Sequence, residues 1–130
     1  MTAGLAATAL AASWLNVLRN ASATAIAQPY FKLHTADPGA SGATAAAVGS
    51  TTRVAASYAA PSAGSMAQTG TAPVWTNGGT SETLTHVSVW DASTAGTFQY
   101  SFALSSSQAW ASGNTFTLST YSFALTPIAA

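Results

Sequence analysis

The stretch TFQYSFAL, residues 97–104, alternates bulky and small side chains with a period of two along its whole length. Its even-numbered residues, three aromatics and Leu104, fall on one face of an extended strand, and the smaller residues fall on the other. Such alternation is typical of a half-buried strand, because successive side chains point to opposite faces of a sheet. The stretch therefore predicts a strand that covers a core with one of its faces.

The segments around this strand show the same period. Residues 84–91 place Val87 and Val89 on one face and bulky residues on the other, which predicts a central strand with two covered faces. Residues 30–35 and 120–125 alternate as well, and turns rich in Gly, Pro and Asn separate the segments. Short strands with such spacing indicate a mainly β fold, an antiparallel β-sandwich or jelly-roll-like domain.

The amino-terminal part of the chain has a helical period instead. Leu10, Trp14, Val17 and Leu18 recur at the i, i+4, i+7, i+8 spacing of one helix face. The many alanines around them favour a helix intrinsically. A single domain, residues 1–130, is expected, with an N-terminal α-helix over 1–22, a β-sandwich over 29–126, and long exposed small-residue loops at about 40–52 and 59–72.

Charge is almost absent from the composition. Only 5% of the 130 residues are charged and the net charge is zero, whereas about 25% is usual in a soluble domain. Nucleic-acid binding through phosphate neutralisation and polybasic membrane binding both need many more cations. No nucleic acid and no membrane are therefore expected among the partners, and the lack of cysteine excludes disulfides and thiolate chemistry.

The core is expected to rest on aromatic rings more than on aliphatic side chains. Strand alternation places seven residues on its inner side: Phe98, Phe102, Leu104, Phe116, Leu118, Phe123 and Leu125. Replacing Phe102 with alanine is expected to cost about 3–5 kcal/mol of stability. Trp75 and Trp110 follow loop-like sequence, so they are either core residues, which is the favoured interpretation, or platforms for sugars.

Residues able to carry out chemistry are too few to form a recognisable site. A metal ion would need His34 or His86 together with Asp37 or Asp91, without any close ligand spacing to support it. Structural roles explain these residues better: hydrogen-bonded histidines, and aspartates that cap turns. Nucleophile-elbow, P-loop and dinucleotide motifs are lacking. No catalytic residue, metal ligand or cofactor is expected, and the chain is not expected to be an enzyme.

A neutral surface with few ions suits a protein that is packed into an assembly. The candidate interface is the apolar face of the amino-terminal helix, Leu10, Trp14, Val17 and Leu18, together with the two small-residue loops. The alternative for the helix is that its apolar stripe closes one end of the sandwich. Exposed flexibility is the alternative for the loops.

Several sequence blocks, in the same order, resemble a family of small structural proteins of tailed bacteriophages. Residues 14–20 (WLNVLRN) and 30–39 (YFKLHTADPG) resemble the opening of that family. Residues 84–92 (LTHVSVWDA) and 96–100 (GTFQY) resemble its central strands, and residues 112–116 (SGNTF) resemble part of its ending. Proteins of this family are described as tail-fibre, virion structural, capsid decoration or minor capsid proteins.

The resemblance implies a non-enzymatic component of a bacteriophage virion. The favoured expectation is a capsid decoration or minor capsid protein on the outer capsid surface, bound to the major capsid protein and to copies of itself in a symmetric assembly. The alternative is a tail or tail-fibre component that contacts the host surface and has tail proteins as partners.

Overall fold

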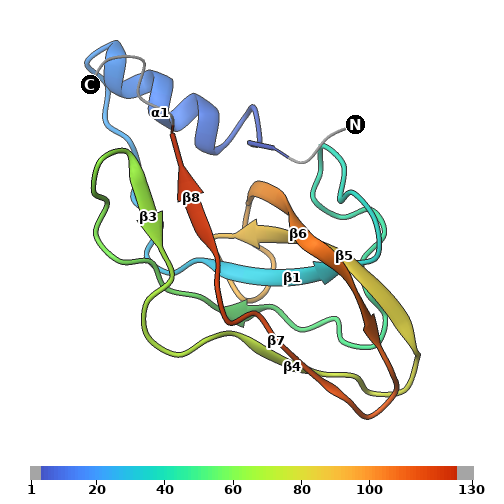
Figure 1. Ribbon diagram of the computed structural model, residues 1–130. Helices are drawn as coiled ribbons and strands as arrows, with labels where there is room; N and C mark the ends of the chain where they lie inside the picture. Colours follow the sequence, from blue (N-terminus) through green and yellow to red (C-terminus); the bar gives the residue numbers. More distant parts are fainter. Residues whose placement is uncertain (1–3, 126–130) are drawn as a thin grey trace.

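The computed structural model describes residues 4–125 and shows a mainly β protein with antiparallel sheets and one short amino-terminal helix (Figure 1). The expected fold class is thereby confirmed. In chain order the elements are α1 (Leu10–Leu18), β1 (Tyr30–His34), β2 (Val54–Ala55), β3 (Ser65–Ala67), β4 (Val74–Thr76), β5 (Glu82–Trp90), β6 (Phe98–Trp110), β7 (Thr115–Thr117) and β8 (Ser122–Ala124).

The largest sheet has four antiparallel strands in the order β2-β1-β5-β6. Across β1 and β5, Phe31 pairs with Val89 and Leu33 with Val87, and Val87 in turn pairs with Phe102 on β6. These paired residues share one face of the sheet, so a row of bulky side chains crosses three strands. The expected central position of β5 is confirmed.

Two short antiparallel ribbons, β3-β8 and β4-β7, form the second layer (Figure 1). Their side chains close over the row on the sheet, and the enclosed core holds residues from both layers. The Phe31 ring lies at its centre, with the Tyr121 ring 4.8 Å away and the Phe102 ring 5.7 Å away, both in edge-on geometry. Aromatic residues therefore do provide much of the core, as the composition indicates.

Five of the seven expected core residues lie in the core or pack against it: Phe102, Leu104, Phe116, Leu118 and Phe123.

The expectation that Phe98 and Leu125 pack with these five residues is wrong, although Phe98 is itself buried. A register shift pairs Val89 with Tyr100 but Trp90 with Phe98, so Gln99 is an extra residue on β6. This β-bulge turns Phe98 to the opposite face, where its ring lies 5.6 Å from that of Trp90. β8 ends at Ala124, so Leu125 lies just beyond the strand and is 54% exposed.

The helix is shorter than the expected span of 1–22; residues 1–3 of that span lie outside the described residues. Residues 4–6 run along the edge of β6: Ala6 N–H donates to the carbonyl of Gln99 (2.8 Å), and Gly4 accepts from the N–H of Ser101 (2.9 Å). Backbone groups bonded to a sheet cannot also make helical hydrogen bonds. At the other end, Asn20 adopts a left-handed conformation (φ 58°), which ends the helix.

The two loops also make more contacts with the strands than expected. Within residues 40–52, Ala47 is fully buried and its N–H donates to the carbonyl of Leu33 (3.0 Å). Gly42, with φ 70°, lies directly against the Phe98 ring. The second loop contains β3, because Ser65–Ala67 find strand partners on β8. In the first loop, small residues such as Gly42 and Ala47 are buried because they allow the backbone to approach the sheet closely, whereas most of residues 59–72 are exposed as expected.

Candidate functional site

The face of the main sheet opposite the core carries a buried chain of hydrogen bonds centred on His34. The His34 Nδ1 lies 2.8 Å from the carbonyl oxygen of Thr44, which can only accept, so Nδ1 carries the proton. His34 Nε2 then accepts from the Ser88 hydroxyl at 2.7 Å, and Ser88 Oγ accepts from the Trp90 indole N–H at 2.8 Å. Each polar group in this chain has a partner of the right kind.

A serine hydroxyl next to a histidine is the arrangement of an activated nucleophile, but His34 and Ser88 are both fully buried. Burial also lowers the pKa of His34, and the hydrogen bond to Thr44 opposes this only in part. The pair therefore fixes the loop of Thr44 on the sheet with a neutral imidazole. The hydrogen-bonded interpretation of His34 is confirmed.

The acidic residues considered as metal ligands have the expected turn-capping contacts. Asp37 Oδ1 accepts from the N–H of Gly39 at 2.9 Å, and Asp91 Oδ1 accepts from the N–H of Thr97 at 2.7 Å. His86 Nδ1 lies 2.8 Å from the hydroxyl of Thr85. Among residues 4–125, no three histidine or carboxylate side chains gather as a metal site would require.

Positive charge collects on this same sheet face. The Arg53 guanidinium lies 3.7 Å from the ring centre of Trp90 and donates to the carbonyls of Ala92 and Ala95. Burial lowers the pKa of Arg53 and, with the nearby Arg53 charge, that of Lys32. Arg53 thus joins the segment before β2 to the turn of residues 92–95 across this face, and the nearby Asp91 charge partly offsets the effect of burial on its pKa.

The amino-terminal helix does not present the four candidate interface residues on one surface. Leu10 and Trp14 line an apolar cleft of about 540 Å³ between the helix and the core, and the Trp14 ring lies 5.7 Å from that of Phe123. Val17 and Leu18, in contrast, are 58% and 85% exposed. The first pair thus closes an end of the sandwich, while the second pair is free for another contact.

Two tyrosines contribute to the lining of that cleft, beside Ser13 and Thr24. Tyr58 and Tyr100 both line it and share a hydrogen bond through their hydroxyls. Burial raises the pKa of Tyr58 to about 12 and raises that of Tyr100 further. Tyr121 nearby exchanges hydrogen bonds with the backbone of Ser57 at 2.9 Å. These phenols are neutral and bonded to partners within the protein.

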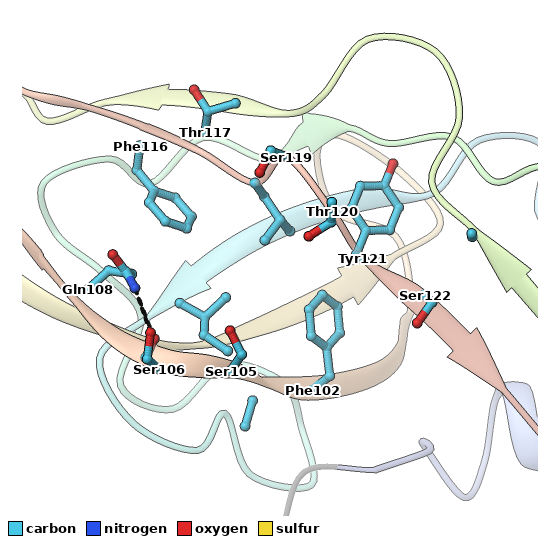
Figure 2. A pocket seen from close by; sticks show the side chains of 14 residues that line it. Phe102, Ser105, Ser106, Gln108, Phe116, Thr117, Ser119, Thr120, Tyr121 and Ser122 are labelled. Atoms are coloured by element: carbon cyan, nitrogen blue, oxygen red, sulfur yellow. Dashed lines mark hydrogen bonds between the residues drawn. The ribbon is translucent and has the colours of Figure 1, made fainter.

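A second hollow lies where β6 and the β7–β8 segment diverge. This groove has a volume of about 720 Å³; it is lined by Ala67, residues 102–106, Gln108 and residues 116–122. Figure 2 shows the rings of Phe102, Phe116 and Tyr121 pointing into it from opposite sides, with serine and threonine hydroxyls around the rim. Sequence reasoning missed this groove; the uncharged run Ser105–Ser107 after an alternating strand is the signal that marks it.

Neither tryptophan considered as a sugar platform is accessible. Trp75 and Trp110 are each 2% exposed. Their indole N–H groups donate to the carbonyls of Thr52 and Asn114, both at 3.0 Å. Their core interpretation is confirmed.

No helix in the described part of the chain combines the length and apolar character needed to cross a membrane. A family model with the description Podophage GP4 fiber I protein gp80 matches residues 5–126. The comparison with curated proteins gave no match. The family match spans nearly all the described residues and confirms the resemblance to small structural proteins of tailed bacteriophages.

Proposed function

The chain belongs to the Podophage GP4 fiber I protein gp80 family, and from that membership we propose that it is a non-enzymatic component of a virion fibre. The family makes it a bacteriophage structural protein and a part of the virion. The expectation of capsid decoration gains no support from the family description, and the alternative expectation, a tail or fibre component, agrees with it better.

Three features of the molecule support a structural rather than a catalytic role. The Ser88–His34 pair is sealed from solvent, and the carboxylates of Asp37 and Asp91 are engaged in turns. The groove beside β6 is lined by hydroxyl, amide and apolar side chains, and its titratable side chain, Tyr121, has its hydroxyl bonded to the backbone of Ser57. Such surfaces bind other proteins more readily than they transform a substrate.

The candidate contacts of this fibre component are the exposed end of α1, with Val17 and Leu18, and the groove beside β6. Neither carries an ionised side chain apart from Arg19, next to the end of α1. Attachment to neighbouring virion proteins then depends on apolar contact and backbone hydrogen bonds, and many weak contacts in a symmetric particle act together as avidity.

Capsid decoration is the second candidate, because the described residues form one non-repeating β fold where a fibre shaft would show structural repeats. Gold-labelled antibodies against the chain, applied to purified virions and viewed by electron microscopy, separate the two. A fibre component is labelled at the tail or its appendages and has a copy number far below that of the major capsid protein. Label spread evenly over the capsid, with a copy number close to that of the major capsid protein, would reject the fibre proposal.

A further inference from the structure

Half of the outer edge of β6 is covered by the chain itself and half is open. Along residues 99–101, the edge is bonded to residues 4–6 through the hydrogen bonds of Ala6 and Gly4. From residue 102 to 109, no backbone hydrogen bond within residues 4–125 joins β6 to any segment other than β5. The fold thus covers this edge as far as its amino-terminal segment reaches.

The open half has fewer internal partners than an ordinary edge strand. On β5, Leu84 pairs with Gln108 and His86 pairs with Ala103, so the four residues 104–107 face Thr85 alone. This bulge of four residues against one leaves backbone groups of residues 104–107 without ladder partners on β5. Ala103 and residues 105–109 are exposed, and this stretch of β6 lines one wall of the groove in Figure 2.

The groove has a second wall of the same kind. β7 pairs only with β4 among the described strands, so its other edge faces the groove. Leu104 and Phe116 are half-buried between the two walls. Extended walls with free backbone donors and acceptors, over an apolar floor, are suited to an extended chain that lies along them.

The open edge is bulged, but it carries neither charge nor proline to keep another strand away. Proteins usually protect such edges with lysine, proline or inward-pointing charge. Residues 92–130 contain no charged residue, and residues 102–122 contain no proline. Two copies of this edge therefore meet without like-charge repulsion, and each supplies the strand that the other lacks.

We propose that β6 joins a second copy of this chain, antiparallel across a two-fold axis, through residues 103–109. Such pairing makes one continuous sheet from the two four-stranded sheets and leaves neither β6 edge open, so association through β6 stops at two copies. The inference goes beyond the proposed function, because it concerns pairing of the purified chain and holds for either place in the virion.

The first test compares the sedimentation of the full chain with that of the double variant Ser105→Lys, Ser107→Lys over a range of concentrations. The parent should form dimers. In the variant, lysines face one another across the paired strands, and we expect dimer affinity to fall by about tenfold or more. Ser41→Lys, in an exposed loop on the opposite side of the main sheet, is the matched control and should dimerise like the parent. Melting curves of all three confirm that each is folded.

The second test uses the absence of cysteine from the chain. Residues near the two-fold axis of antiparallel strands have Cα atoms about 4.5–5.5 Å apart, which a disulfide can bridge. Under mild oxidation, at least one of Ser105→Cys, Ser106→Cys and Ser107→Cys should give a covalent dimer, whereas Ser41→Cys should not. A parent that stays monomeric at all concentrations, a lysine variant that dimerises like the parent, or no preference for the β6 cysteines would each overturn the proposal.

Discussion

Replacing Phe31 with alanine is the most direct test of how this core is built. Phe31 has no exposed surface, and the rings of Tyr58, Phe102 and Tyr121 meet it edge-on at centroid distances of 6.3, 5.7 and 4.8 Å. Truncating a buried phenylalanine to alanine costs about 3–5 kcal/mol of stability, and each lost aromatic pair adds to that cost. We expect a loss near the upper end of the range.

The magnitude is measured by urea unfolding, followed by circular dichroism, together with a thermal scan. For a chain of this size, such a loss corresponds to a decrease in melting temperature on the order of 10–20 °C. Phe102→Ala should cost about 1–3 kcal/mol, less than the sequence alone indicated, because that ring is only half-buried at the groove. Leu18→Ala is the control: the side chain is 85% exposed, and its loss should change stability by no more than about 0.5 kcal/mol. If Phe31→Ala unfolds within 1 kcal/mol of the parent (roughly the spread of a surface change), the ring packing described above is not what stabilises the core.

Four further outcomes follow from the structure. The pKa of buried His34 lies below its ordinary value of 6.5, so the unfolded chain takes up a proton first as the pH falls. The free energy of unfolding should therefore decrease from pH 6.5 down to that lowered pKa, by up to about 1.4 kcal/mol per pH unit. This dependence on pH should vanish in His34→Gln. The pKa of Tyr58 is raised to about 12, so its contribution to stability should be complete below pH 10 (the usual tyrosine value) and decrease above that pH. Absorbance at about 295 nm should show this phenol ionising at a higher pH than a free tyrosine. Gly42→Ala should lower the stability of the protein by more than about 1 kcal/mol, since the added Cβ would lie 2.2 Å from the Phe98 ring at a φ of 70°. The control Gly79→Ala, with no atom within 4 Å of the new Cβ, should melt like the parent. Equal melting temperatures of the two variants would refute this. Finally, washing virions in about 1 M NaCl, where the Debye length is about 3 Å, should not release the protein; release would show that ion pairs hold it.

The strand faces could be predicted because alternation is a property of the sequence alone. Phe31 and Leu33 pair with Val89 and Val87 on β5. The alternation of residues 84–91 predicts that these two valines share one face. The bulge at Gln99 could not be found in this way, since it arises from how β5 and β6 pair and not from either strand's own pattern. One extra residue was enough to move Phe98 to the other face.

The candidate site was harder to predict for a similar reason. Helical spacing identifies Leu10 and Trp14 together with Val17 and Leu18, but only the position of the helix on the body decides which of them remain exposed. The groove depends on β6 and β7 diverging after a short turn, and that follows from the pairing of β7 with β4. Tertiary partners of this kind leave no periodic signal in a single sequence.

The strand order of the main sheet also bears on how the chain folds. β5 and β6 are consecutive and form a local hairpin, whereas β1 must close the loop of residues 35–81 before it reaches β5. Closing a long loop costs entropy before any contact compensates for it, which slows folding. Residues 4–6 cover β6 from more than 90 residues earlier in the sequence, so during synthesis they find their place only after residue 101 has been made. The segment that covers β6 is therefore expected to be among the last parts of this fold to settle.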